Sequence, residues 1–140
     1  MSVQDAYRGR LREHFTRPRN QGDLAGCSTS ARLNNPLCGD EIEVGVWREG
    51  PALASVRFRA RACAICVASA SLMTEQVAGG PEAAALALAG QVRAWIESGG
   101  EPPADLPEPL VALAVTRDLP NRERCVTLPW EALEQALEGC

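Results

Sequence analysis

The sequence predicts an α+β fold, in which a small antiparallel three-stranded sheet carries helices packed on one face. Two observations lead to this expectation. Apolar and polar residues alternate, as in a strand, only from about residue 30 to residue 61, and the flanking segments repeat their apolar residues at helical spacing. The chain therefore runs in the order helix, strands, helices, and it shows no internal repeat.

The first helix is expected over residues 3–16, where Val3, Tyr7 and Leu11 recur at helical spacing. The segment RPRNQGDLAG, residues 17–26, is rich in turn-forming residues and ends this helix. The pattern predicts an amphipathic helix.

A β-hairpin is expected next. In its first strand, two sets of residues alternate: Ile42, Val44 and Val46 with Glu43, Gly45 and Trp47. The second strand likewise alternates Leu53, Ser55, Arg57 and Arg59 with Ala54, Val56 and Phe58. The segment REGPA between the strands is typical of a turn, so the pattern predicts a hairpin with one polar face. Residues 32–34 could add a third strand.

Further helical segments are expected after the hairpin. The first has an apolar face through Ile65, Ala68 and Leu72, and it stops at Gly79-Gly80. The second, PEAAALALAGQVRAWIES, begins with a proline suited to a first helical turn and stops at Gly99-Gly100. The acidic, Pro-rich connector EPPADLPEP then leads to a short helical stretch, LVALAVTR.

The last helix contains the segment WEALEQALE. Pro129 comes just before this segment, and a proline has no backbone N–H and clashes with the preceding turn of a helix. The helix is therefore expected to start near Thr127 or to be kinked there, with Cys125 just before it.

The bulk composition excludes several classes of protein. A length of 140 residues fits one domain, residues 1–140, with a single core. The formal net charge of −4 argues against a nucleic-acid partner, which would need a basic face. No apolar run approaches the ~20 residues that cross a bilayer, and the charged N-terminus lacks the apolar core of a signal peptide. The protein is therefore expected in the cytoplasm, with no membrane partner.

Six cysteines, at positions 27, 38, 63, 66, 125 and 140, favour metal or sulfur chemistry, because stable disulfides are disfavoured in a reducing compartment. The plain alternative, that any one of them is a small core residue, stays open. Cys63 and Cys66 form a local C-x-x-C pair. Such a pair is compatible with a redox dithiol, half of a zinc site or two buried side chains.

Four residues at the ends of expected elements are candidate metal ligands: Cys38, Asp40, Cys63 and Cys125. Gly39 lets the backbone fold tightly, so both of its neighbours can approach one ion. Backbone N–H groups at a helix start favour an anion and lower the pKa of a thiol placed there. Three thiolates and a carboxylate suit zinc, or iron bridged by sulfide, although the spacing matches no local zinc-finger pattern.

Three segments, NNPLCGDEIEV, CAICVASASLMTE and LPNRERCVTLPWEAL, resemble in order the signature segments of the IscU/SufU (NifU N-terminal type) iron–sulfur cluster assembly proteins. Tyr7, His14-Phe15 and Pro18-Arg19-Asn20 with Gly22 also resemble the opening helix and turn of that family. The resemblance covers nearly the whole chain and implies the SufU/IscU-like fold. The metal or cofactor ligands that it implies are Cys38, Asp40, Cys63 and Cys125.

The resemblance is closer to the SufU branch. The IscU branch has a histidine directly before its last cysteine, where this chain has Arg124, and residues 122–125 resemble the R-x-K-C type of segment of the SufU branch. The helix and connector between residues 81 and 120 are consistent with the longer insertion of that branch. The resemblance therefore implies bound zinc.

For function, the resemblance implies a protein that binds zinc or iron and accepts persulfide sulfur from a cysteine desulfurase of the SufS/IscS type. Cys38 is the expected nucleophile, which would make the protein a zinc-dependent sulfurtransferase, and whether it is an enzyme stays open. One alternative is a non-enzymatic scaffold that assembles a transient [2Fe–2S] cluster for apo iron–sulfur client proteins or other assembly factors. Another is a divergent relative with a purely structural zinc.

Three features depart from the family's pattern. Residues 60–62, Ala-Arg-Ala, replace the usual G-x-G before the middle cysteine, Cys66 replaces the usual serine, and Pro129 replaces a helix-favouring residue. None of them removes an implied ligand, so they indicate a divergent member. Cys66 is expected to be a small buried thiol, and Cys27 and Cys140 are expected to have no role.

Overall fold

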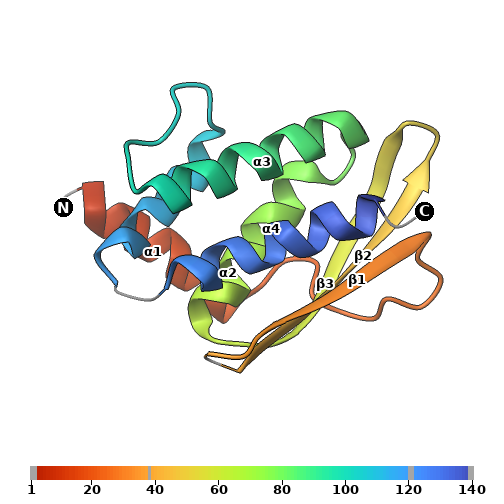
Figure 1. Ribbon diagram of the computed structural model, residues 1–140, viewed down its shortest axis with the longest axis horizontal. Helices are drawn as coiled ribbons and strands as arrows, with labels where there is room; N and C mark the ends of the chain where they lie inside the picture. The colour runs from red at the N-terminus through yellow and green to blue at the C-terminus, as the bar shows by residue number, and fades with distance from the viewer. Residues whose placement is uncertain (1–2, 38, 120–121, 139–140) are drawn as a thin grey trace.

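The computed structural model describes residues 3–37, 39–119 and 122–138, without the side chains of residues 3–4 and 117–118. The chain runs from α1 to α4 (Figure 1). In order, the elements are α1 Val3–Thr16, β1 Thr29–Asn35, β2 Asp40–Glu49, β3 Ala52–Arg61, α2 Ala64–Val77, α3 Glu82–Ser98, the 3₁₀-helix η1 Glu108–Asp118 and α4 Glu123–Glu138. This order confirms the predicted α+β class.

The strands form one antiparallel sheet in the order β1-β2-β3. The turn residues Pro36, Leu37 and Gly39 lie between β1 and β2, and Gly50-Pro51 joins β2 to β3. The third strand expected at residues 32–34 is confirmed as β1. Its full length pairs with the first part of β2, and its last residue, Asn35, lies opposite Asp40.

One end of the β2–β3 hairpin does not follow the expected alternation. The pattern groups Leu53 with the polar residues of β3, but Leu53 is fully buried and Ala54 is exposed. The register shifts here, because Ser55 pairs with Trp47 whereas Leu53 pairs with Arg48, so that Ala54 is an extra residue. An extra residue in a strand exchanges which side chains beyond it point to the core and which point to solvent. The predicted alternation is therefore wrong at Leu53 and Ala54.

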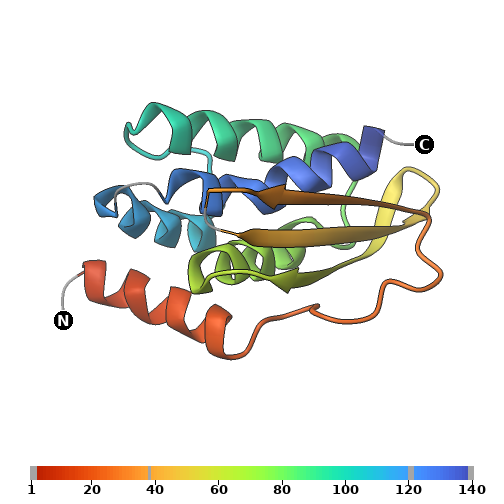
Figure 2. The same ribbon diagram turned by 60° about the horizontal axis from the view of Figure 1, so that its bottom comes forward.

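Helices cover one face of the sheet (Figure 1, Figure 2). α4 lies against β1 and β2, and α2 lies against β3. α3 packs on α4, and α1 packs on α2 and η1. The largest side chains of the core between these layers include Trp130, Phe58, Ile42, Leu53, Leu72 and Met73. No helix in the described part of the chain has both the length and the apolar character needed to cross a membrane.

The segment between α1 and β1 covers part of the opposite face of the sheet. Gln21 forms a bridge with Phe58, and the side chain of Leu24 is buried over Gly45. A Cβ atom at Gly45 would lie 3.0 Å from Leu24 Cδ2, a tight contact that would displace Leu24, so glycine suits the close approach of this segment. The rest of this face, near Asp40, stays open.

α4 starts earlier than predicted. It begins at Glu123, and Pro129 lies inside it. Of the two alternatives expected for Pro129, the start near Thr127 is therefore wrong, and the kink stays a prediction. Cys125 lies in the first turn of the helix rather than before it. The hydrogen bond that Pro129 cannot donate is offset by burial, because residues 125–128 are all buried.

Candidate metal centre

Three of the four predicted ligands meet at one end of the molecule. Asp40 is the first residue of β2, Cys63 stands between β3 and α2, and Cys125 lies in the first turn of α4. One carboxylate oxygen and the two sulfur atoms all lie within 4.8 Å of one another. Residues far apart in the sequence are thus neighbours in space. Cys38, the fourth predicted ligand, lies outside the described residues.

The sheet explains why Asp40 and Cys63 meet. β2 and β3 are antiparallel, so the start of β2 lies beside the end of β3. The chain then passes directly from β3 into α2, whose N-terminal cap is Cys63. The turn before Asp40 is closed by Gly39, which has a φ of +77° and donates its N–H to the Asn35 carbonyl at 2.8 Å. Glycine adopts this conformation without strain, which explains the C-G-D motif.

The Asp40 carboxylate is buried, at 3% exposed, and contacts Cys63 through both oxygens. Its Oδ1 accepts a hydrogen bond from the Cys63 N–H at 2.8 Å, and its Oδ2 lies 3.4 Å from Cys63 Sγ. One oxygen therefore secures the start of α2, while the other faces the thiol. A role in holding the helix start and a role as a metal ligand are compatible in this geometry.

The electrostatics of the site favour a bound cation. Burial raises the pKa of the Cys125 thiol far above its ordinary value, and hydrogen bonds with Asp40 and Cys63 act in the same direction. The Arg122 guanidinium, whose Nη1 lies 4.0 Å from Cys125 Sγ, opposes this shift. The charged forms of three neighbouring acidic groups disfavour one another, and a cation would stabilise all three. Two thiols and a carboxylate therefore fit zinc or iron.

The other cysteines and His14 lie away from this group. Cys66 is fully buried in the core, and its sulfur does not belong to the group of ligand atoms. Cys27 is half-buried, and Cys140 lies outside the described residues. His14 packs against α2, where its Nδ1 lies 2.6 Å from Ser71 Oγ. The C-x-x-C pair is thus divided between the site and the core.

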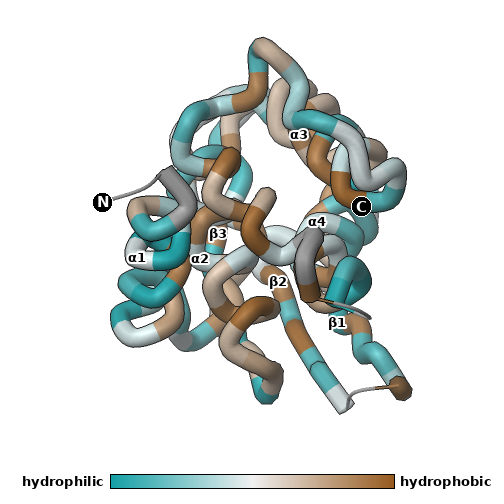
Figure 3. Tube along the Cα trace, turned by 90° about the vertical axis from the view of Figure 1, so that its left-hand side faces the viewer, coloured by the Kyte–Doolittle hydropathy of each residue, from teal (hydrophilic) through white to brown (hydrophobic). Residues whose placement is uncertain are grey.

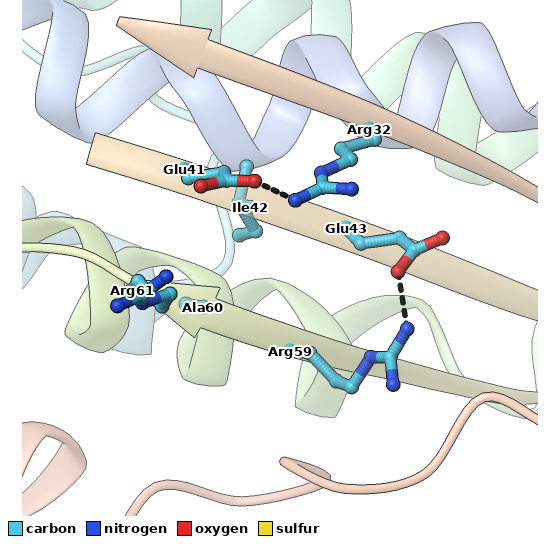
Figure 4. Close-up of a pocket in the computed structure, with 7 residues that line it drawn as sticks. All are labelled: Arg32, Glu41, Ile42, Glu43, Arg59, Ala60 and Arg61. Carbon is cyan, nitrogen blue, oxygen red and sulfur yellow. Dashed lines mark hydrogen bonds and ion pairs between the residues drawn. The ribbon is translucent and has the colours of Figure 1, made fainter. Parts of the chain in front are cut away.

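A charged hollow lies beside the centre, on the open face of the sheet (Figure 4). Its lining residues are Arg32, Glu41, Ile42, Glu43, Arg59, Ala60 and Arg61. Two arginine–glutamate pairs span it, and in one of them Arg59 Nη2 lies 2.6 Å from Glu43 Oε1. Arg61, two residues before Cys63, has no ion-pair partner among the described residues. Sequence reasoning missed this hollow, although the charges alternating along β2 and β3 are a signal for it.

Comparison with known proteins identifies the family. The family model for the NifU-like N terminal domain matches residues 6–138. This match spans most of the chain, and the chain therefore belongs to the NifU-like N-terminal domain family. The resemblance inferred from the three motif segments is confirmed.

Two curated relatives are similar over most of their length. The chain is 35% identical over 134 residues to the iron-sulfur cluster assembly scaffold protein IscU of Streptococcus pyogenes serotype M1, covering 94% of this chain and 82% of that protein. It is 33% identical over 133 residues to the zinc-dependent sulfurtransferase SufU of Bacillus subtilis (strain 168), covering 94% and 88%. These two identities are nearly equal, so they do not choose between the two activities.

Solved structures share the fold. One, described as a scaffold protein for iron–sulfur cluster assembly in the SUF system of Fervidobacterium islandicum AW-1, has a TM-score of 0.85 at 25% identity, covering 97% of this chain and 99% of that chain. The N-terminal part of a NifU-like protein from Brucella abortus has a TM-score of 0.84 at 21% identity, covering 97% and 94%. The predicted sheet with helices on one face is therefore the fold of this family.

Proposed function

We propose that this protein, as one SufU/IscU-like domain in the cytoplasm, accepts persulfide sulfur from a cysteine desulfurase and binds zinc through Cys38, Asp40, Cys63 and Cys125. The observation that carries the proposal is the meeting of three of these residues within 4.8 Å in a largely buried place. The similarity to a zinc-dependent sulfurtransferase, over 94% of the chain, supports zinc as the metal. Arg124, in place of the histidine of the IscU branch, supports the same choice.

Each ligand has its own task in this proposal. Cys63 and Cys125 anchor the ion from the starts of two helices. Asp40 Oδ2 provides an oxygen ligand, which a thiolate-preferring metal releases more readily than sulfur. Bound zinc would keep the thiolates deprotonated at neutral pH. Cys38 is the nucleophile, because it directly follows Leu37 in the sequence, and Leu37 is 95% exposed.

The transfer step conserves atoms and electrons. The Cys38 thiolate attacks the outer sulfur of the desulfurase persulfide, R–S–S–H. A new S–S bond forms at Cys38 as the S–S bond of the persulfide breaks, and the electron pair of the broken bond leaves with the desulfurase thiolate. Cys38 then carries S–S–H, so the step needs no added oxidant or reductant. The sulfur passes onward to apo iron–sulfur client proteins or other assembly factors.

The end of the molecule that holds the ligands suits a protein partner. Figure 3 views this end, where the turn between β1 and β2 projects from the sheet. Leu37 in that turn is by far the most exposed large apolar side chain among the described residues. Arg61 adds a guanidinium without an ion-pair partner in the described part of the chain. A partner with an apolar contact for Leu37 and a carboxylate for Arg61 would bring its persulfide to this end.

Metal content and stimulation of a cognate desulfurase test the proposal. We expect tight zinc in the purified protein and a stimulation that is lost in Cys38→Ala. Cys63→Ser or Cys125→Ser should sharply weaken zinc binding, whereas Cys66→Ser, a matched change outside the ligand group, should not. A zinc stoichiometry that depends on Cys66 would contradict the ligand set. A wild-type protein that holds no metal and leaves the desulfurase unaffected would refute the function.

A scaffold that builds a [2Fe–2S] cluster on the same ligands is the second candidate. The similarity to a protein named as an IscU scaffold, at 35% identity, favours it. Anaerobic reconstitution with iron and sulfide would then give a labile visible chromophore that moves to an apo iron–sulfur protein. Tight zinc without any effect on a desulfurase would instead support a purely structural metal.

A further inference from the structure

Two buried serines of α2 hold different neighbours. Ser69 and Ser71 are both 0% exposed. Ser69 is hydrogen-bonded to α4. Ser71 is hydrogen-bonded to His14 in α1 and to the backbone N–H of Arg19 after it. The two serines therefore match in residue type, burial and helix, and they differ in the element to which they bind.

Ser69 joins α2 to α4 through two hydrogen bonds. Its Oγ donates to the Val126 carbonyl at 2.7 Å and accepts from Trp130 Nε1–H at 3.0 Å. A hydroxyl has one hydrogen, so the bond accepted from Trp130 leaves that hydrogen for the Val126 carbonyl. Ser69, Val126 and Trp130 are all 0% exposed. Hydrogen bonds shielded from water are electrostatically stronger than exposed ones, so they fix the relative position of the groups that they join.

These bonds lie close to the ligands in both helices. Val126 directly follows Cys125, and Ser69 lies less than two helical turns after Cys63. Pro129, inside α4, has no N–H to donate to the carbonyl of Cys125, four residues earlier. The Ser69 hydroxyl donates to the next carbonyl, that of Val126, from outside α4, so it links the first turn of α4 to α2.

We propose that Ser69, oriented by Trp130, is a positioning residue for the metal centre. It holds Cys125 at a separation from Cys63 that one ion can bridge. This inference rests on the proposed function, because it concerns metal binding at that site. Zinc–thiolate bonds have a narrow length, about 2.3 Å, so a displaced first turn of α4 would weaken the site. Hydrogen bonds that orient ligands typically change metal affinity by about 10–100-fold.

The test compares Ser69→Ala with its matched control, Ser71→Ala. Zinc affinity is measured by competition with a chromophoric chelator, and ligand geometry by the visible absorption of Co²⁺ bound in place of zinc. Unfolding of the metal-free proteins reports the structural cost of each change. We expect Ser69→Ala to weaken zinc binding by about 10-fold or more and to alter the cobalt spectrum. Ser71→Ala should lower stability but leave zinc affinity and the spectrum unchanged.

Trp130→Phe is a second variant, which removes the N–H but keeps an aromatic ring in the core. Because the Ser69 hydroxyl remains, it should weaken zinc binding less than Ser69→Ala and alter the cobalt spectrum in the same direction. If Ser69→Ala does not fold, Trp130→Phe tests the positioning role instead. A zinc affinity of Trp130→Phe equal to that of wild type would then overturn the inference.

Two further outcomes are distinct. Equal zinc affinity in Ser69→Ala and Ser71→Ala would overturn the positioning role and leave the proposed function intact. A wild-type protein without zinc affinity would overturn the zinc binding of the proposed function, and the role of Ser69 with it.

Discussion

Asp40 has two tasks that substitution can separate. Its Oδ1 accepts the Cys63 N–H, and its Oδ2 faces the sulfur. Asp40→Asn keeps an acceptor for the N–H but loses the charge, so we expect zinc affinity to fall sharply while the metal-free protein keeps its stability. Asp40→Ala should also cost about 1 kcal/mol of unfolding free energy, because the N–H loses its partner. Chelator competition and urea unfolding measure the two effects, and equal stability loss in both variants would contradict this division.

The side chain of His14 is buried, and both of its ring nitrogens have polar neighbours. Ser71 Oγ accepts the Arg19 N–H at 2.8 Å and lies 2.6 Å from His14 Nδ1. His14 Nε2 lies 3.5 Å from Glu75 Oε1. Other charged groups near the ring are Arg19, Glu13 and Arg10. The site therefore favours the neutral imidazole.

His14 should make stability depend on pH. Burial, together with Arg19, lowers the pKa of His14 below its ordinary value of 6.5. The unfolded chain then takes up a proton that the folded protein disfavours, so the free energy of unfolding falls as the pH drops through about 6.5. His14→Gln removes this dependence, and its stability deficit relative to wild type should shrink between about pH 7.5 and 5.5. Urea unfolding at both pH values checks this, and a constant deficit would contradict it.

Among the elements, the turn between β1 and β2 depends on the backbone of Gly39. Its φ is +77°, and no atom lies within 4 Å of an added Cβ, so Gly39→Ala would introduce backbone strain without a clash. We expect a loss of about 1–2 kcal/mol in unfolding free energy and weaker zinc binding. Gly22→Ala is the control, because Gly22 also has open space around it and no positive φ. Equal stability of the two variants would contradict this reasoning.

The same turn should make the contact with the desulfurase. Leu37 is 95% exposed, so Leu37→Asp costs the folded protein little. We expect it to weaken desulfurase binding on the order of 10-fold, or 1.4 kcal/mol, with zinc content unchanged. Leu119→Asp serves as the control, because Leu119 is also exposed, at 41%, but lies outside this turn. Titration of the desulfurase with each variant measures the effect, and unchanged binding by Leu37→Asp would remove this turn from the interface.

For the whole molecule, a metal at this site would tie together β2, α2 and α4. Zinc that binds only the folded state adds about 4.1 kcal/mol when its free concentration is 1,000 times the dissociation constant. We therefore expect zinc to raise the melting temperature by on the order of 10 °C, and a strong chelator to reverse this. Thermal unfolding of wild type and Cys125→Ser tests it. A similar rise in Cys125→Ser would show that zinc acts elsewhere.

Sequence periodicity predicted most elements because it depends on neighbours along the chain. The helices before and after the sheet and the central hairpin follow from the repeat of apolar residues. It failed where a distant contact changed a local rule. Because Ala54 is an extra residue in the strand, the side chain of Leu53 points into the core. α4 begins at Glu123 and continues past Pro129, in a segment that is buried in the core. At the start of β3 and at Pro129, the local conformational preference of the sequence is weaker than the packing of the core.

The candidate site shows the same division. The order of three motif segments was enough to identify the family and to nominate Cys38, Asp40, Cys63 and Cys125 as ligands. The 4.8 Å grouping of three of them, the second task of Asp40 and the bond from Ser69 to α4 appear only in the folded chain. The ability of a side chain to bind a metal depends on its residue type, which can be read directly from the sequence. Distance is set by antiparallel pairing and helix packing between segments far apart along the chain, which no local pattern encodes.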